Sequence, residues 1–416
     1  MHEKITLPNG VRILFEKIPH VRSVSCGIWV GAGSRYEKAS ENGASHFIEH
    51  MVFKGTKTRS AQQLAAVMDE LGGQINAFTA KEHTCFHGRV PDTRTMTLCE
   101  ILCDLFFDSV FSETDVRNEC GVICEEIDMY EDTPEDLVTE RLMSAVYAGT
   151  SLARPILGSK RSLRKMDGEF LRSFMKKHYS ASSTVVAVCG SVSDEAIEYL
   201  KARFSELPKS RPVRLSAIEY VQAFTAKRKS IEQNHLALGF PGIGLADRDR
   251  FAMQLMSMIL GGGMSSRLFQ AVREKRGLCY GIDSFSGSFI GTGFFAVCTA
   301  LGKDTELKAL GVIKDEILRF TEYGVTEDEL RCAREQIKAN ILMSLELTNS
   351  RMFKLGKNEL FFGFVPTTDE TLAAFDAVTA DDISNLACRC LDFGRLSFSA
   401  VGRVSEEDGY RKILSV

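Results

Sequence analysis

The chain has 416 residues, of which 44% are hydrophobic and 25% charged, and its formal net charge is −4. This composition is typical of a globular protein with two or three domains, and it excludes a strongly basic nucleic-acid-binding surface. No window holds the ~18 consecutive apolar residues of a membrane span, and the first residues match neither a signal peptide nor a transit peptide. We therefore expect a cytoplasmic protein without membrane or nucleic-acid partners.

The first half of the chain alternates strands and helices. Apolar alternation around a turn at residues 7–10 predicts a hairpin, and residues 24–30 predict a further strand. A helix with two histidines follows, for which Asn42 and Ser45 are candidate N-cap residues. The remaining elements expected in this half are a helix over 60–71, two strands within 74–90, helices over 91–107 and 113–130, more helix to about 179, and a strand over 184–189.

The histidine-bearing segment GASHFIEHMVFKGT carries the main functional signal. His46 and His50 are four residues apart with Glu49 between them, so on a helix all three side chains fall within about 100° of arc. Two imidazoles on one helix face can hold a divalent ion, and Glu49 would then lie beside the open position of that ion. The alternative is a pair of ordinary histidines on an amphipathic helix.

Cysteine usage gives a second candidate metal site. The twelve cysteines are too few for a disulfide scaffold in a chain of this length, and we expect reduced core thiols. The alternative is a four-thiolate zinc site formed by two pairs of cysteines spaced four apart, Cys99/Cys103 and Cys120/Cys124. The segment LCEILCDLFF around the first pair is typical of a buried helix, which favours thiols that pack as small hydrophobic groups.

The second half of the chain repeats the order of the first. After a polar segment with two prolines come a strand over 235–240, a helix over 250–260, a helix–break–strand unit, and long helices over 305–323 and 326–347. Gly27 and Gly239 centre the matching strands, Gly190 and Gly402 lie near the two ends, and both pairs are 212 residues apart. The chain therefore predicts an α+β protein with two homologous domains, 1–208 and 231–416, joined by a linker at 209–230. Two unrelated α+β domains are the alternative.

Only the first domain is expected to hold a metal, because the second has the apolar run FAMQLMSMIL where the histidines would be. A catalytic zinc takes three protein ligands, so folding must bring in a third. The predicted helix over 117–130 offers four candidates: Glu119, Glu125, Glu126 and Asp128. Glu119 and Glu126 are seven apart and share the apolar face, where a carboxylate is costly unless it pairs or coordinates. Glu125 points elsewhere.

HFIEHMVFKGT followed by NECGVICEEI resembles the pitrilysin-type metallopeptidases, the inverzincin family of insulin-degrading enzyme and the mitochondrial processing peptidase. The resemblance implies domains built of an antiparallel sheet packed with helices, and one zinc per chain held by His46, His50 and Glu126. It further implies that Glu49 is the general base and that Glu119 supports the catalytic site. The implied activity is zinc-dependent endopeptidase cleavage of unfolded or presequence-like peptides.

The same resemblance implies how substrate is held. Residues 72–79 resemble the edge strand that pairs with substrate backbone, which assigns substrate contacts to Asn76, Ala77 and Phe78. In the second half, Arg273 and Tyr280 resemble the substrate-holding pair of the family. Short bacterial two-domain relatives pair two chains, so the resemblance implies a homodimer with the active site shared between protomers.

Two further points stay open from the sequence. His83 and His87 are also four apart, but they lie in a strand-like alternation without a carboxylate pattern, and we expect structural histidines. The alternative to an enzyme is a non-catalytic scaffold like the respiratory-complex core subunits related to the processing peptidase, which have lost parts of the metal motif. This chain has every part of the motif, which favours the enzyme.

Overall fold

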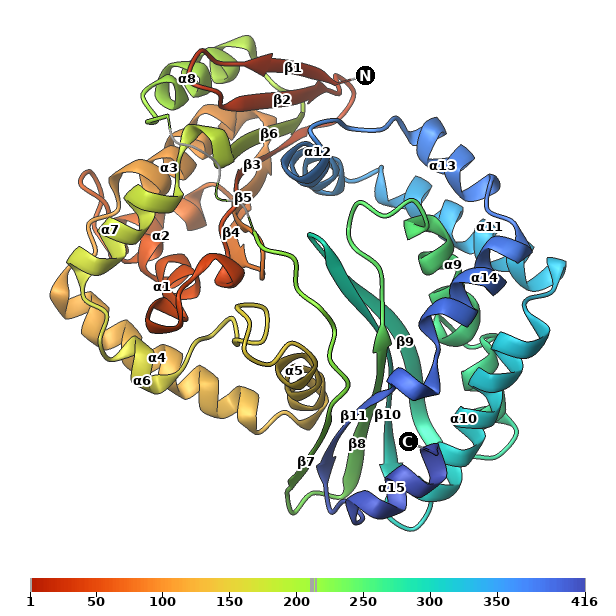
Figure 1. Cartoon of the computed structure of the whole chain (residues 1–416). Helices are drawn as coiled ribbons and strands as arrows, with labels where there is room; N and C mark the ends of the chain where they lie inside the picture. Colours follow the sequence, from red (N-terminus) through yellow and green to blue (C-terminus); the bar gives the residue numbers. More distant parts are fainter. Residues whose placement is uncertain (1, 210–212, 214, 416) are drawn as a thin grey trace. The chain divides into compact units, whose positions relative to one another are not determined.

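The computed structural model describes residues 2–209, 213 and 215–415 (Figure 1). The chain forms two compact units. Unit 1 comprises Met1–Ile127, Arg154–Arg214 and Ile341–Thr367, and unit 2 comprises Asp128–Ala153, Leu215–Asn340 and Thr368–Val416. Within the described part of the chain, no helix has the length and apolar character needed to span a membrane.

Unit 1 is a six-stranded sheet in the order β1-β2-β6-β3-β5-β4, covered by helices on both faces. Its strands are β1 (Glu3–Thr6), β2 (Arg12–Lys17), β3 (Ser23–Val30), β4 (Gln74–Thr79), β5 (Thr84–Pro91) and β6 (Thr184–Gly190). Its helices are α1 (Ala44–Met51), α2 (Ala61–Glu70), α3 (Thr95–Asp108), α6 (Lys160–Leu163), α7 (Gly168–His178), α8 (Asp194–Ser205), α12 (Thr348–Phe362) and most of α4 (Glu113–Glu131). The strand β4 lies at the edge of this sheet.

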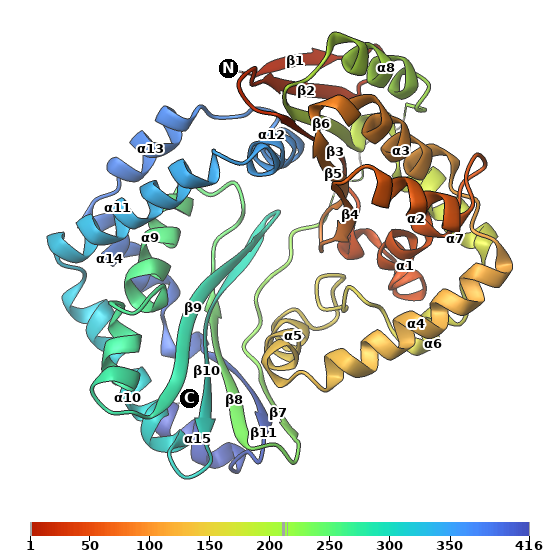
Figure 2. The ribbon, with the colours of Figure 1, turned by 180° about the vertical axis from the view of Figure 1, so that it is seen from behind.

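Unit 2 has a five-stranded sheet in the order β7-β11-β8-β10-β9. Its strands are β7 (Phe224–Arg228), β8 (Gln233–Pro241), β9 (Cys279–Phe289), β10 (Thr292–Gly302) and β11 (Ser397–Gly402). Its helices are α5 (Pro134–Val146), α9 (Arg250–Gly261), α10 (Glu306–Tyr323), α13 (Thr368–Asp376), α14 (Ala380–Cys390), α15 (Glu407–Leu414) and most of α11 (Glu327–Ser344). The long β9–β10 hairpin is clear from behind in Figure 2.

Each half of the chain gives one helix to the sheet of the other half. The helix α12, from the second half, packs on β3 and β6 of unit 1, and α5, from the first half, packs on β8 and β11 of unit 2 (Figure 1). One of the two glycine pairs that mark the repeat, Gly27 and Gly239, lies under these helices. A Cβ on Gly27 would collide with Met352 of α12, and one on Gly239 would lie 2.9 Å from Leu142 of α5. Glycine at both positions therefore lets a helix lie close to the sheet.

The α+β class with two sheet-and-helix domains is confirmed, with two differences in detail. Each sheet is mixed, because β2 runs parallel to β6 and β7 runs parallel to β11, whereas wholly antiparallel sheets were predicted. The compact units also differ from a division at residues 208 and 230, because α5 and α12 are exchanged and the predicted linker contains the strand β7. Positions 210–212 and 214 of that linker lie outside the described residues.

A carboxylate at the start of α11 gives unit 2 a pH-dependent stability. Glu329 accepts hydrogen bonds from Nε and Nη2 of Arg267 at 2.6 and 2.8 Å and from the N–H of Thr326 at 2.8 Å. The bond from Arg267 is the main reason that the pKa of Glu329 is lowered to about 2. In the unfolded chain the carboxyl has its ordinary pKa of about 4.3, so its stabilisation is present above that pH and is lost as pH falls towards 2.

We expect Glu329→Gln to lower the free energy of unfolding at pH 7 by on the order of 1–2 kcal/mol, a figure reduced for partial exposure to solvent. The difference between wild type and variant should shrink steadily from pH 5 to pH 3. Urea unfolding of both proteins across this range measures it. A difference that stays constant over the range contradicts the assignment.

Candidate metal centre

The helix α1 places the three motif side chains together on one side of unit 1. The rings of His46 and His50 lie 4.6 Å apart between centroids, and the His46 side chain is almost fully buried. Phe47, Ile48 and Met51 are fully buried and attach the helix to the core of unit 1. The apolar side chains thus attach the helix to the core, and the two histidines face α4.

Glu126 on α4 completes a three-residue cluster with the two histidines. Its Oε2 lies 3.7 Å from Nε2 of His46 and 3.4 Å from Nε2 of His50. One ligand atom from each of these residues lies within 4.8 Å of the other two, and no other such group of three occurs among the described residues. Glu125 is exposed to solvent.

The cluster fits a tetrahedral zinc ion. Zn–N and Zn–O bonds of about 2.0–2.2 Å at tetrahedral angles separate neighbouring ligand atoms by about 3.3–3.6 Å. The two distances from Glu126 to the imidazoles are close to this separation. The Oε2 atom of Glu126 is also buried and has no hydrogen-bond partner among the described residues. A buried carboxylate oxygen without a partner is costly unless a cation lies beside it.

Glu119 sets the orientation of His50. Its Oε1 lies 2.9 Å from Nδ1 of His50, and its Oε2 lies 2.7 Å from Nζ of Lys54. Because an ionised carboxylate only accepts hydrogen bonds, Nδ1 must be the donor, so in the neutral form of the ring the lone pair is on Nε2, the nitrogen that faces Glu126. Burial would raise the pKa of Glu119, but the bonds from His50 and Lys54 outweigh it and lower that pKa.

The two histidines differ in their electrostatic surroundings. Burial, followed by the charge of His50, lowers the pKa of His46 to about 4, so His46 is neutral near pH 7. For His50, burial lowers the pKa, but the hydrogen bond to Glu119 and the charges of Glu126, Glu119 and Glu49 outweigh it and raise the pKa. A metal ion requires both rings in the neutral form.

Glu49 lies next to this cluster and is not part of it. Burial raises the pKa of Glu49, against opposing hydrogen bonds from Thr79 and the charge of His50. Its Oε2 atom is buried and has no hydrogen-bond partner among the described residues. Thr79 is the last residue of β4, so the edge strand of the sheet directly contacts the carboxylate that is a candidate general base.

The edge strand β4 presents its main chain unevenly. Ala80 donates its N–H to the C=O of His83, so these two residues form a hydrogen-bonded pair. Such pairs alternate along an antiparallel ladder, and the main-chain groups of Asn76 and Phe78 therefore bond to β5. The N–H of Ala77 then faces the free edge, where it donates to Oδ1 of Asn76 at 2.8 Å. The Phe78 ring packs against Trp29 and Phe353, so Phe78 has a packing role in addition to any contact with substrate.

Arg273 and Tyr280 lie together in unit 2. The guanidinium carbon of Arg273 is 5.0 Å from the centre of the Tyr280 ring, and a second contact of 4.6 Å joins it to Phe269. Tyr280, on β9, is 80% exposed despite its size. The two residues therefore form a stacked pair on the surface of unit 2, with the aromatic ring available to a ligand.

The other candidate ligands pack in the interior. His83 stacks on Trp29 with centroids 5.4 Å apart, His87 contacts Phe353, and burial is the main reason that the pKa of each is lowered. All twelve cysteines are free, and Cys99 and Cys103 are buried in α3. Cys99 contacts Cys26 in the core. Among the described residues, Cys99, Cys103, Cys120 and Cys124 do not form a group that could hold a metal ion.

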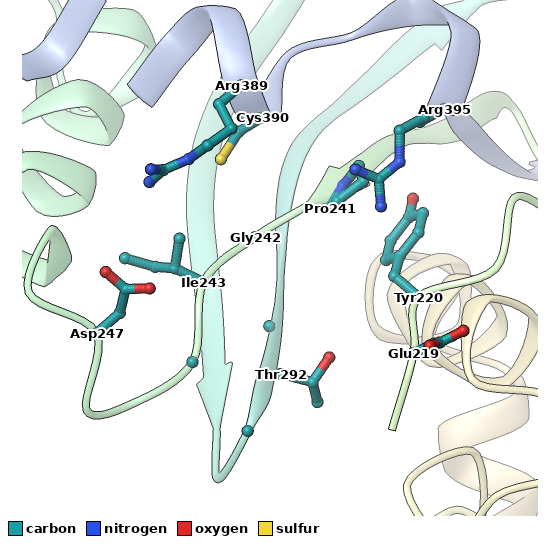
Figure 3. Close-up of a pocket in the computed structure, with 13 residues that line it drawn as sticks. Glu219, Tyr220, Pro241, Gly242, Ile243, Asp247, Thr292, Arg389, Cys390 and Arg395 are labelled. Carbon is teal, nitrogen blue, oxygen red and sulfur yellow. The ribbon is translucent and has the colours of Figure 1, made fainter. Parts of the chain in front are cut away.

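Unit 2 contains a hollow of about 500 Å³ between the β8–α9 loop, the tip of the β9–β10 hairpin and the end of α14 (Figure 3). Its lining includes two arginines and two acids, and no histidine. Arg389 is paired with Asp249 at 2.6 Å, and Figure 3 places Arg395 beside Tyr220 on the opposite side. The hollow therefore lacks the donor set of unit 1 and does not define a second metal site.

Three contributors to the site were missed by sequence reasoning. Thr79 bonds to Glu49, Lys54 bonds to Glu119, and Glu37 binds the start of α1. Asn42 and Ser45 were predicted as N-caps, but the N-cap is Gly43, in the left-handed region with φ of +97° and without a capping side chain. Only Lys54 had a signal in the sequence. It follows His50 by four residues, and residues four apart on a helix are neighbours, so the sequence places Lys54 near His50.

Two histidines, a carboxylate that faces both of them and a second carboxylate beside them are the residue set of a metalloprotease. A family model described as insulinase, peptidase family M16, matches residues 12–160, and one described as the peptidase M16 inactive domain matches residues 165–337. The chain is 39% identical over 388 residues to the uncharacterized zinc protease YmxG of Bacillus subtilis, a match that covers 93% of this chain and 95% of that protein. The chain belongs to peptidase family M16.

Further similarities agree with this assignment. The uncharacterized zinc protease SCO5738 of Streptomyces coelicolor is 37% identical, with 98% of this chain and 91% of that protein covered. A crystal structure described as the peptidase M16 inactive domain from Pseudomonas fluorescens has a TM-score of 0.90 at 19% identity, with coverage of 97% and 98%. A protease from Helicobacter pylori has a TM-score of 0.89 at 18% identity, with coverage of 96% and 99%. At these identities the two structures support the fold alone.

Proposed function

We propose that this protein is a zinc-dependent endopeptidase with one zinc ion per chain, held by His46, His50 and Glu126. The observation that carries the proposal is the convergence of three ligand atoms within 4.8 Å of one another beside the buried carboxylate of Glu49. The names of the bacterial relatives, zinc proteases, agree with the choice of metal. The chemistry supplied by bound zinc is Lewis-acid polarisation of a water and of a peptide carbonyl.

Glu49 would act as the general base. It accepts a proton from the attacking water at Oε2, the oxygen without a hydrogen-bond partner, and returns it to the leaving amine. The raised pKa of Glu49 suits this role, because a base is most effective when its pKa lies near the operating pH. Glu119 would keep the His50 ring in the orientation and tautomer that a ligand needs.

Substrate would bind in an extended form along β4. Ala77 offers main-chain groups at the free edge, and Asn76, whose side chain occupies its N–H, would have to turn aside. Backbone pairing of this kind tolerates many sequences, which suits unfolded or presequence-like peptides. Arg273 and Tyr280, the exposed stacked pair, would hold the substrate from the second domain, 231–416.

The test is zinc-dependent cleavage of a panel of fluorogenic unstructured peptides. We expect cleavage by the metal-loaded protein, loss of cleavage with a chelator and recovery when Zn²⁺ is added back. No cleavage across a broad panel by protein that holds one equivalent of zinc would contradict the proposal and favour a non-catalytic scaffold.

We also propose that the protein acts in the bacterial cytoplasm as a homodimer, in which each substrate meets the zinc domain of one protomer and the Arg273–Tyr280 pair of its partner. The dimer should be visible by analytical ultracentrifugation at micromolar concentration. Mixing Glu49→Gln and Arg273→Ala protomers should restore part of the activity that each variant lacks. Full activity from a monomer contradicts the shared site.

A further inference from the structure

The metal-binding helix α1 begins without a cap of its own. The N-cap, Gly43, has no side chain, and the first N–H groups of an α-helix have no partners within the helix. Glu37, six residues before Gly43, supplies hydrogen-bond acceptors for two N–H groups at this end of the helix. Its Oε2 accepts the N–H of Gly43 at 2.8 Å, and its Oε1 accepts the N–H of Ser45 at 2.8 Å. Both carboxylate oxygens are thus used by the start of one helix.

The surroundings of Glu37 hold it in this position. Its side chain is buried, and its Oε2 also accepts a hydrogen bond at 3.1 Å from the amide of Asn42, which in turn donates to the C=O of Pro155 at 2.9 Å. Arg154 donates to the main-chain oxygen of Glu37. Lys81 donates to the C=O of Arg154 at 2.7 Å. These bonds join the segment before α1 to the residues around 155 and to the β4–β5 turn.

This arrangement has a direct consequence for His46. The residue that follows Ser45 is His46, so the carboxylate of Glu37 fixes the turn of helix that carries the first imidazole. An isolated helix of eight residues is marginal in water, and metal ligands must be held to within about 0.5 Å. His50, one turn later, is held separately by Glu119. Nδ1 of His46 has no hydrogen-bond partner among the described residues, so the position of this ring depends on the helix that carries it.

We propose that Glu37 is a positioning residue for the metal centre, which it serves by capping α1 so that His46 lies opposite Glu126. The inference rests on the proposed zinc site at His46, His50 and Glu126. Glu37 acts through the helix and touches neither metal ligand nor substrate. Removal of a hydrogen bond made directly to a metal ligand typically weakens metal binding 10–100-fold, and for Glu37, which acts through the helix, we expect the lower end of this range.

The experiment compares Glu37→Gln with Ser193→Ala. Glutamine has nearly the same shape, but its NH₂ group faces one of the two helix N–H groups and cannot accept from it. Ser193 caps α8 through the N–H of Ala196 at 3.2 Å, far along the chain from the ligands, so Ser193→Ala also removes a helix cap from unit 1. Zinc affinity is measured by chelator competition, and thermal stability is measured on the metal-free proteins.

We expect Glu37→Gln to bind zinc about 10-fold more weakly and Ser193→Ala to bind it within twofold of wild type, although both variants melt at lower temperature. Cobalt-substituted Glu37→Gln should also lose intensity in its visible d–d bands, because His46 moves from its ligand position. If the zinc affinity and the cobalt spectrum of Glu37→Gln are the same as those of wild type, the proposal is overturned and Glu37 is an ordinary helix cap.

Two safeguards keep the test decisive. If Glu37→Gln does not fold, Glu37→Asp is used, whose shorter carboxylate can reach one N–H group but not both, and an intermediate loss of zinc affinity is expected. Wild type and His46→Ala are measured in parallel. If His46→Ala binds zinc as tightly as wild type does, the proposed function itself is contradicted. If zinc affinity falls in His46→Ala but not in Glu37→Gln, only the role of Glu37 is contradicted.

Discussion

Replacement of Glu49 by glutamine should reduce peptide cleavage by a factor of about 10³–10⁴, with zinc still bound. Glutamine keeps the size of the side chain and can still accept from Thr79, but it cannot take a proton from water. The ligand atoms of His46, His50 and Glu126 are unchanged, so metal content should stay at one zinc per chain. Turnover and zinc content are measured on the same preparation.

The matched control is Glu125→Gln on α4. Glu125 is exposed and adjacent in sequence to the proposed ligand Glu126, so this variant makes the same chemical change a short distance from the centre. Its activity should stay within about twofold of wild type, as is usual for exposed substitutions. Retained turnover in Glu49→Gln would remove Glu49 as the base. Loss of zinc from that variant would instead give Glu49 a structural part in the metal site.

Gly356→Ala should destabilise the protein by about 3 kcal/mol, at the upper end of the range for overpacking. Gly356 lies on the face of α12 that packs on Trp29, and a Cβ at this position would collide with the indole ring. Trp29 is 1% exposed, so the ring cannot relieve the collision by turning out into solvent at its present position. Since α12 comes from the second half of the chain, this substitution weakens the packing between the exchanged helix and the sheet of the unit that carries the proposed metal site.

Gly311→Ala in α10 is the opposite case. It is also a glycine in a helix, but no atom lies within 4 Å of the Cβ that alanine would add. Alanine is favoured over glycine within a helix by about 0.5–1 kcal/mol, so this variant should be slightly more stable than wild type. Urea unfolding measures both proteins. Equal effects of the two substitutions would show that helix propensity, and not the contact with Trp29, decides the outcome at Gly356.

The residues proposed to hold metal could be predicted because the signal is local. The spacing of His46, Glu49 and His50 follows from one helical turn, and the seven-residue spacing of Glu119 and Glu126 places both on one helix face. The choice of Glu126 as ligand and Glu119 as support came from the resemblance to a family. In the structure Oε2 of Glu126 lies 3.4 Å from Nε2 of His50 and Oε1 of Glu119 lies 2.9 Å from Nδ1 of His50, while the roles of the two carboxylates stay proposals.

The supporting contacts could not be predicted in the same way. Glu37 reaches the start of α1 through a loop, and Thr79 reaches Glu49 from a strand thirty residues away, so neither contact has a sequence period. The exchange of α5 and α12 was also missed. The predicted helices of the second half end at residue 347, so α12 itself was not expected, and amphipathic patterns show which face of a helix is buried but not which sheet covers it.

The repeat in the sequence has a physical explanation that only the structure supplies. Gly27 and Gly239 make room for the exchanged helices, whereas Gly190 and Gly402 end β6 and β11 with φ of +124° and +143°. A Cβ at either of the latter two positions would also collide, with the main chain of Ser23 or with the side chain of Asn234. Both pairs therefore have the same structural roles in the two halves, which supports a duplicated domain.

The most direct measurement is an X-ray structure of the zinc-loaded protein with anomalous difference maps on both sides of the zinc edge. We expect one strong peak per chain, about 2.0–2.2 Å from Nε2 of His46, Nε2 of His50 and Oε2 of Glu126. The nearest oxygen of Glu49 should lie outside bonding distance. A peak that lies elsewhere, or the absence of any peak from protein that contains zinc in solution, would contradict the central claim.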